Sequence, residues 1–364
     1  MDSPTAQASI EIGASPERVY ELVSNVVEVP KWAEEIQTCT WKGGATGPSV
    51  GAKFRGRNKQ TWRRWSTTCK VTAAEPGRRF AYQVYSGGVR SAEWEYEIEP
   101  TDEGCRVTER TKRQVPKALA TAVNDWQVAE WLDPEPRLRA SIAVSTENPP
   151  AAVAEINRVG NDKRFVQVQF GGRTQEPMGR RKYWPIYEAA ARHGLHIMSH
   201  AFGSYGNPIT GAGWPSFYLE DHVGPAQAAQ ANIVSLVTEG VFDHFPTLKF
   251  VSVENGFGWI PSLMWRMDAA WSLLKSEVPH LKRLPSEYIR EHVYLTTQPV
   301  EEPHRPGQFV ELMDHFGDMV NNILFASDYP HWDSDDPDFA LPNVLSEEVK
   351  AKIHYENGRE LYNL

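Results

Sequence analysis

The sequence predicts two domains of different class, an α+β domain over residues 1–115 and an α/β domain over residues 116–364. Three observations predict this division. In the first domain a single helical segment precedes strands in which apolar and polar residues alternate, which is typical of an antiparallel sheet. In the second, short apolar strands alternate with helical segments, which is typical of a parallel sheet covered on both faces. The charge also changes, from 17 Lys and Arg against 15 Asp and Glu up to residue 115 to 21 against 32 after it.

Length and composition exclude several classes of protein. A chain of 364 residues fits two domains, and 41% hydrophobic residues are enough for folded cores. Neither domain has a basic helix face, so we expect no nucleic-acid partner. The longest stretch without Asp, Glu, Lys or Arg, residues 193–219, contains three His and several Gly and Pro, so we expect no membrane span.

The cysteines favour a reducing compartment. Cys39, Cys69 and Cys105 form no C-x-x-C motif, and the N-terminal residues lack the charged and apolar regions of a signal peptide. An odd, sparse set of cysteines is typical of reduced thiols. We therefore predict a cytoplasmic protein, and the sequence leaves homo-oligomer formation open.

The first predicted element after an initial strand is a helix that begins near Ser15. Ser15 is a favourable N-cap, and Pro16 suits the first helical position, where its missing N–H has no partner to lose. Apolar residues then recur at helical spacing, which predicts one buried face. These residues are Val19, Leu22, Val23 and Val26.

The strands that follow predict a sheet with one aromatic face. Over residues 93–99, Trp94, Tyr96 and Ile98 alternate with four glutamates, so we expect the apolar residues to face inward and the glutamates to face water. Large aromatic residues recur at predicted inward positions: Trp41, Trp62, Trp65, Tyr82, Trp94 and Tyr96. They predict either a ligand cavity, with Trp94 and Tyr96 in a substrate pocket, or a core of packed rings. We find no inward His–Asp pair or paired carboxylates, so catalysis here has no support.

This segment resembles the START-like superfamily, in particular its polyketide cyclase/dehydrase and lipid-transport members (SRPBCC proteins). The resemblance rests on IEIGASPERVYELV (10–23), VPKW (29–32) and EWEYEI (93–98), and it covers about residues 5–113. It implies a helix-grip fold around an apolar ligand, closed by a long C-terminal helix. That helix is absent here or replaced by the shorter stretch 117–132.

Six short apolar strands recur in the second domain, and helical segments such as 149–159, 182–194 and 224–240 lie between them. The predicted strands cover residues 138–144, 165–170, 195–202, 248–254, 292–297 and 322–327. Helical crossovers between buried strands predict about six βα units.

Polar residues stand at the ends of four of these strands, where a parallel α/β fold places its chemistry. They are His200, Glu254, Gln298 and Asp328, and His331 follows soon after. Imidazoles and carboxylates that converge there suit a divalent metal that activates water. Taken singly, His200 also fits a buried structural histidine and Asp328 a cap on the following turn.

Residues 124–364 resemble the amidohydrolase-related (amidohydrolase 2) family of metal-dependent TIM barrels, which includes aminocarboxymuconate-semialdehyde decarboxylase. The matching segments include NDWQVAEWL, EGVFDHFPTLKFVSVENGFGWIPSLMWRMD and ILFASDYPHWDSDDP. The resemblance implies that His200 is a metal ligand and that Asp328 is a metal ligand or general base. Glu254 stands where the better-known decarboxylases have a catalytic histidine.

The resemblance also implies that part of the barrel is missing. The family's first strand ends in H-x-H, which holds two metal ligands, and this chain contains no H-x-H. The six units then correspond to the third to eighth units of an incomplete (β/α)8 barrel. Such a sheet leaves two strand edges unpaired.

These observations support a metal-dependent enzyme, with an appended apolar-ligand domain, that hydrolyses or decarboxylates a small aromatic or polyketide-like acid. Catalytic roles fall to Asp328, Glu254 and His331, metal binding to His200 and Asp328, and substrate contact to Gln298. The expected metal is zinc, with manganese as the alternative. Two other hypotheses stay open. In one, only the START-like pocket acts, in ligand binding or cyclisation; in the other, the chain is an inactive truncated fusion.

Overall fold

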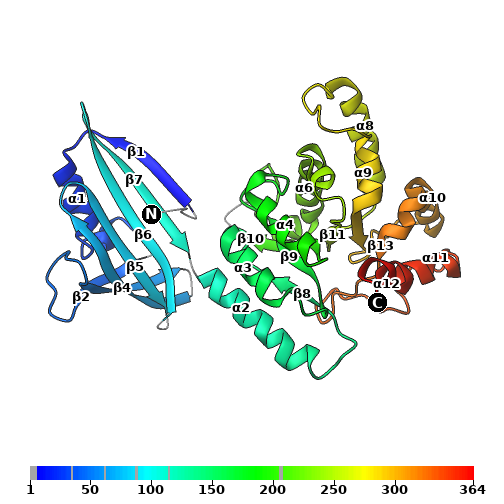
Figure 1. Ribbon diagram of the computed structural model, residues 1–364, viewed down its shortest axis with the longest axis horizontal. Helices are drawn as coiled ribbons and strands as arrows, with labels where there is room; N and C mark the ends of the chain where they lie inside the picture. The colour runs from blue at the N-terminus through cyan, green and yellow to red at the C-terminus, as the bar shows by residue number, and fades with distance from the viewer. Residues whose placement is uncertain (1–5, 34–35, 61–62, 87–88, 114, 205–207) are drawn as a thin grey trace. The chain divides into compact units, whose positions relative to one another are not determined.

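The computed structural model describes residues 6–33, 36–60, 63–86, 89–113, 115–204 and 208–364 (Figure 1). The chain divides into two compact units, residues 1–119 and 120–364, which we call unit 1 and unit 2. The predicted residue Trp62 lies outside the described ranges. None of the helices in these ranges has the length and apolar character that a membrane crossing needs.

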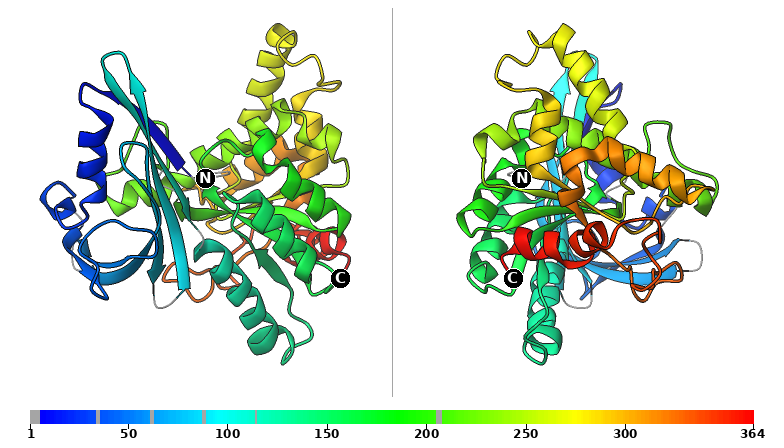
Figure 2. Two further views of the ribbon diagram at one scale, coloured as in Figure 1. Left: turned by 60° about the vertical axis from the view of Figure 1, so that its left-hand side comes forward. Right: turned by 90° about the vertical axis from the view of Figure 1, so that its right-hand side faces the viewer.

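Unit 1 is built on an antiparallel sheet of seven strands in the order β1-β7-β6-β5-β4-β3-β2, which confirms the predicted α+β class. The strands are β1 Ala6–Ile12, β2 Ile36–Lys42, β3 Lys53–Gln60, β4 Arg63–Glu75, β5 Arg79–Ser86, β6 Val89–Thr101 and β7 Gly104–Arg113. Helix α1 (Pro16–Ser24) lies along one face of this sheet, as Figure 2 shows, and a 3-10 turn, η1 (Val29–Lys31), follows it.

Helix α1 begins as the sequence predicts. The Ser15 side chain accepts a hydrogen bond from the Arg18 N–H at 3.3 Å, and Pro16 is the first helical residue. Val19 and Val26 are buried, as expected, but the expectation that Leu22 is buried is wrong, because 47% of its surface is exposed. The reason is that Leu22 lines a cavity beside α1 instead of packing into the core.

The expectation that all four glutamates of the segment 93–99 face water is wrong for Glu95, which is only 3% exposed. Two arginines on neighbouring strands cover it. Arg79 Nε donates to Glu95 Oε2 at 2.8 Å, and Arg110 lies 3.5 Å from Oε1. Burial raises the pKa of Glu95, but the hydrogen bond and charge of Arg79 help to bring it below its usual value.

Unit 2 contains a parallel sheet whose described strands follow the order β13-β12-β11-β10-β9-β8. A parallel sheet is what the alternating pattern predicts. The strands are β8 Ala140–Ala143, β9 Phe165–Arg173, β10 His196–Ser204, β11 Phe250–Val253, β12 Val293–Thr296 and β13 Ile323–Leu324. The interpretation of this sheet as a barrel that lacks two units stays a prediction.

Helical segments connect these strands, and those predicted over 149–159, 182–194 and 224–240 are confirmed. The α-helices are α2 Val115–Gln127, α3 Pro149–Val159, α4 Trp184–Arg192, α5 Tyr218–Val223, α6 Pro225–Thr238, α7 Val241–His244, α8 Ile260–Leu274, α9 Pro285–His292, α10 Pro306–Phe316, α11 Glu347–Ala351 and α12 Asn357–Tyr362. Shorter 3-10 and π segments are η2 Val128–Leu132, η3 Arg181–Tyr183, η4 Gly317–Asn322 and η5 Lys352–Glu356. The stretch predicted to replace the closing helix, 117–132, thus forms the C-terminal part of α2 together with η2.

A buried polar network attaches the C-terminal half of α2 to the sheet of unit 2. Asn124 is fully buried; its Nδ2 donates to the Ala143 carbonyl at 2.9 Å, and its Oδ1 accepts from the Ala143 N–H at 2.8 Å. The same Nδ2 donates to Glu155 Oε1 at 2.8 Å, and Glu155 also accepts from Thr121 at 2.8 Å and from Arg158. The Asn124 side chain therefore forms hydrogen bonds with both the N–H and the carbonyl of Ala143 in β8, the strand at one edge of the described sheet.

Candidate active site

The carboxyl ends of the unit 2 strands bring together the predicted site residues. His200 lies on β10, Glu254 directly follows β11, and Asp328 comes shortly after β13. Glu254 and Asp328 both have φ near 57°, a left-handed conformation that side chains with a Cβ seldom adopt. Strained backbone of this kind is concentrated at functional sites, because the surrounding structure has to maintain it. At Glu254 part of that support comes from Thr296, whose Oγ1 accepts from the Glu254 N–H at 3.0 Å.

Two imidazoles and two carboxyls form one hydrogen-bonded chain. His200 Nε2 lies 2.9 Å from Glu254 Oε1, and His331 Nδ1 lies 2.9 Å from the Asp328 carboxyl. The carboxyls of Glu254 and Asp328 are themselves hydrogen-bonded. Both are largely shielded, with side chains about 10% exposed, whereas His331 is 59% exposed. The series of hydrogen bonds therefore leads from a shielded pair of carboxyls to an imidazole that contacts solvent.

The surroundings shift the pKa values of the two carboxyls in opposite directions. Burial raises the pKa of Glu254, but the hydrogen bond and charge of His200, together with the hydrogen bond to Asp328, bring it below its usual range. Burial also raises the pKa of Asp328, and the negative charge of Glu254 adds to this against the opposing effect of His331. Asp328 in turn raises the pKa of His331, because its carboxyl accepts the hydrogen bond from His331 Nδ1 and because of its charge. Glu254 is thus the stronger acid of the pair, and Asp328 is the weaker one.

A cavity of about 160 Å³ opens beside this chain. Glu254, Asp328, His331 and the predicted contact residue Gln298 all line it. Gln298 is 2% exposed, and its Nε2 donates to the Asp333 carbonyl at 3.3 Å. An engineered apolar cavity of about 150 Å³ is enough for a benzene ring. The cavity therefore matches a ligand with a single ring.

Sequence reasoning missed the aromatic wall of this cavity. The His222 ring on α5 lies between Tyr218 and Trp332, with ring centroids 5.5 and 5.7 Å away. His222 Nε2 lies 3.3 Å from an Asp333 carboxylate oxygen. The only signal in the sequence was that Trp332 and Asp333 directly follow His331. Tyr218 and His222 belong to the long uncharged stretch and its continuation, where no strand end pointed to them.

The described residues supply part of a metal site. His200 and Asp328, the two predicted ligands, belong to the same hydrogen-bonded chain, but each already contacts a neighbour, Glu254 and His331 respectively. Within the described ranges, no group of three or more His, Cys, Asp and Glu side chains is placed to hold one metal ion. A catalytic zinc takes three protein ligands and a water. The donor set here therefore does not fit a three-ligand catalytic metal.

Unit 1 contains a larger cavity of about 1130 Å³. Trp94 and Tyr96, the predicted pocket residues, line it together with Trp65, Phe54 and Tyr82. The aromatic rings also pack on one another: Phe54 lies edge-on to Tyr82 at 5.2 Å and to Trp41 at 5.5 Å. Both readings of the aromatic residues, cavity lining and ring packing, thus have a counterpart in the structure.

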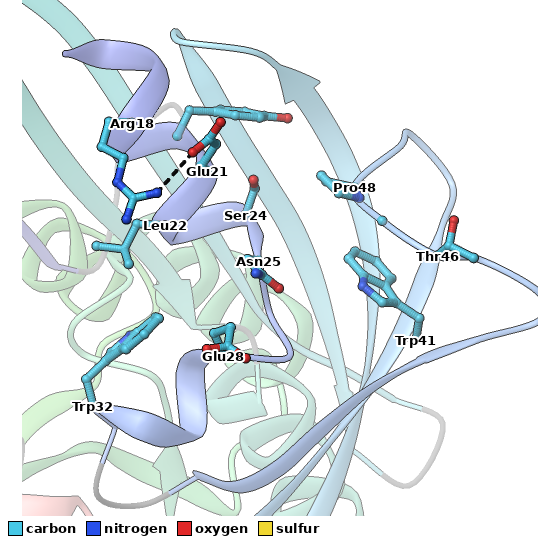
Figure 3. Close-up of a pocket in the computed structure, with 12 residues that line it drawn as sticks. Arg18, Glu21, Leu22, Ser24, Asn25, Glu28, Trp32, Trp41, Thr46 and Pro48 are labelled. Atoms are coloured by element: carbon cyan, nitrogen blue, oxygen red, sulfur yellow. Dashed lines mark hydrogen bonds and ion pairs between the residues drawn. The ribbon is translucent and has the colours of Figure 1, made fainter.

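A neighbouring hollow of about 680 Å³ shares Leu22 and Trp32 with this cavity. Figure 3 shows Leu22 and Trp32 toward the left of the view and Trp41 and Pro48 toward the right. Arg18 and Glu21 form an ion pair of 3.1 Å at its edge. The hollow therefore adjoins the larger cavity along the edge formed by α1 and η1.

Comparisons with known protein families agree with both resemblances. Residues 96–364 match the model of a family described as amidohydrolase. Residues 3–139 match a family described as polyketide cyclase/dehydrase and lipid transport.

Similar proteins are found among both characterised enzymes and solved structures. Gamma-resorcylate decarboxylase of Rhizobium sp. (strain MTP-10005) is 26% identical over 263 residues, which are 68% of this chain and 76% of that enzyme. The crystal structure of dihydroxybenzoic acid decarboxylase from Polaromonas sp. JS666, with bound manganese and 2-nitroresorcinol, superposes with a TM-score of 0.53 at 25% identity and covers 68% of this chain and 76% of that one. The manganese-bound 5-carboxyvanillate decarboxylase from Novosphingobium aromaticivorans has a TM-score of 0.55 at 21% identity, with 68% and 70% covered.

Proposed function

The chain belongs to the amidohydrolase family, and we propose that unit 2 is an enzyme that removes the carboxyl group of a small aromatic acid without oxidation. The observation that carries this proposal is the hydrogen-bonded pair of carboxyls, Glu254 and Asp328, on the wall of a cavity sized for one ring. Two carboxyls in contact cannot both ionise easily, so the pair holds a proton close to a bound ligand. Hydrolysis of a related acid derivative is the alternative for the same residues.

In the proposed reaction Asp328 transfers its proton to the ring carbon that bears the substrate carboxylate. The ring electrons form the new C–H bond, the bond to the carboxylate then breaks, and its electron pair returns to the ring as CO2 leaves. Asp328 regains a proton through His331, which contacts solvent. Glu254, paired with His200, keeps the proton of the pair on Asp328, and Gln298 would contact a polar group of the substrate.

The reaction can be tested with a panel of ortho-hydroxybenzoates in D2O, with the phenol product and CO2 measured together. We expect at least one acid to yield its phenol with a single deuterium at the position of the lost carboxylate. Aryl esters and anilides in the same panel measure hydrolysis. A folded protein that converts none of these compounds would contradict the proposal, and cleavage of the esters or anilides alone would replace decarboxylation by hydrolysis.

Metal binding provides a separate prediction. The manganese in two of the similar structures supports a divalent cation, zinc or manganese. His200 and Asp328 would hold it only when the Asp328 carboxyl is ionised, so a bound ion and a proton on Asp328 exclude each other. Because two protein donors hold such an ion weakly, we expect well under one equivalent of zinc or manganese after dialysis, measured by mass spectrometry of the metal. Retention of a full equivalent, lost in His200→Ala but kept in the control variant His315→Ala on α10, would show instead that a third donor completes the site.

The cavity of unit 1 supports a second function, the binding of an apolar aromatic ligand. Its volume and its Trp and Tyr lining are those of a small-molecule site. We expect Trp94→Ala to weaken the binding of pyrene by about tenfold, because one aromatic wall is lost. Titration of the full chain, followed by pyrene emission, measures this affinity. The control is Trp265→Ala, at an exposed position of α8; equal losses in both variants would count against the cavity.

A further inference from the structure

The inner face of β7 carries one carboxylate among apolar residues. Cys105 and Val107 point inward and are buried in the core of unit 1, and Glu109 occupies the next inward position. Glu109 lines the cavity of about 1130 Å³. A carboxylate placed against apolar walls loses hydration, so its position needs compensation from hydrogen bonds.

Part of that compensation comes from a tyrosine on the adjacent strand. The Tyr96 hydroxyl on β6 donates to Glu109 Oε1 at 2.6 Å, and Tyr82 on β5 lines the same cavity. Tyr82 is fixed by ring contacts with Phe54 at 5.2 Å and Phe80 at 5.6 Å. Burial and the neighbouring Glu109 both raise the pKa of Tyr96, so this phenol keeps its proton and acts as a donor. One oxygen of the carboxylate is therefore held by the Tyr96 hydroxyl.

The second oxygen of Glu109, Oε2, has no hydrogen-bond partner among the residues that the structure describes. Lys59 is the single cationic residue among those that line the cavity in the described part of unit 1, and it is exposed. No ion pair joins it to Glu109 within the described ranges. The outward-facing arginine of the same strand, Arg110, is already paired with Glu97 at 2.5 Å. One acceptor of the carboxylate is thus left to a group inside the cavity.

We propose that Glu109 and Tyr96 form the polar end of this cavity and bind the hydroxyl group of an otherwise apolar aromatic ligand with several fused rings. The ligand hydroxyl donates to Glu109 Oε2, and its rings lie against the aromatic walls that include Trp94 and Tyr82. A ligand carboxylate at the same place would be repelled by the charge of Glu109. This inference rests on the second function proposed above, ligand binding by unit 1.

The test compares three probes on the full chain: 1-hydroxypyrene, 1-methoxypyrene and pyrene. A hydrogen bond to a charged acceptor predicts that hydroxypyrene binds about tenfold or more tightly than methoxypyrene, which has no donor. Glu109→Leu should bring the two affinities together, and Glu109→Gln, which keeps a carbonyl acceptor, should reduce their difference only in part. Glu99→Leu, at an exposed position of β6, is the matched control and should leave the difference unchanged.

The outcomes separate this inference from the function on which it rests. Equal affinities of hydroxypyrene and methoxypyrene for the unaltered chain would overturn the role of Glu109 and leave the cavity as an unselective apolar site. If none of the three probes binds, ligand binding by unit 1 fails as well. A cationic probe, 1-pyrenemethylammonium, that binds more tightly than hydroxypyrene would show that the ligand group is an ammonium and would refute the hydroxyl.

Discussion

Asp328→Asn should lower the rate of decarboxylation by about a thousandfold or more, because the amide has no proton to deliver to the substrate ring. The exchange is nearly isosteric. It is also well suited to this backbone, since asparagine tolerates the left-handed conformation that residue 328 adopts. A loss of activity would therefore report the missing proton. The measurement is kcat for the best substrate of the hydroxybenzoate panel, with the melting temperature as a check of the fold.

Asp338→Asn is the matched control, because Asp338 is an exposed aspartate of the same loop. It should keep kcat within about twofold of that of the unaltered chain. An unchanged kcat in Asp328→Asn would show that Asp328 does not donate the proton, and the role of proton donor would then fall to His331. An intermediate loss in Glu254→Gln is expected as well, because the neutral amide no longer holds the proton on Asp328.

The second large effect concerns stability. Asn124→Ala should lower the free energy of unfolding of unit 2 by about 3 kcal/mol, because it leaves both backbone groups of Ala143 and one oxygen of Glu155 without their partner in a buried place. For a domain of this size such a loss corresponds to a fall of about 6–12 °C in melting temperature. Differential scanning calorimetry of the full chain measures it.

Asp125→Ala provides the control on the same helix. Asp125 is 59% exposed and pairs with Arg158 at 2.8 Å, an exposed contact that contributes about 1 kcal/mol or less. Similar melting temperatures for the two variants would show that the Asn124 network does not stabilise unit 2.

The same network also predicts how the stability of unit 2 changes as the pH falls. Burial raises the pKa of Glu155. The hydrogen bonds from Arg158, Asn124 and Thr121 lower it by more than burial raises it, so the pKa of this carboxyl in the folded chain is below its usual value. Such a group stabilises the fold above its unfolded pKa, and the stabilisation is lost as the pH falls through the folded pKa. Without Asn124 the folded pKa moves closer to the unfolded one, so that loss should be smaller and should be complete at a higher pH. Urea midpoints between about pH 3 and pH 7 would show whether it is.

The sequence predicted the strand-end residues because each follows a short apolar run, and in a parallel sheet such ends meet at one edge. It could not predict Tyr218 or His222, because the short helix α5 rather than a strand end brings them to the cavity. Glu95 was misplaced for a different reason: alternation gives the face of a side chain, but not the arginines on neighbouring strands that cover it. The metal expectation came from resemblance, and the contacts of His200 and Asp328 could not be read from spacing.

The left-handed conformation of Glu254 and Asp328 also creates a conflict between stability and activity at both positions. Glycine suits that conformation better than either acid. Selection for heat resistance alone would therefore favour Glu254→Gly and Asp328→Gly, and selection for turnover would restore the acids. Variants from the two selections should therefore carry different residues at these positions. At this edge of the sheet, where the chemistry is proposed, a gain in stability should cost activity.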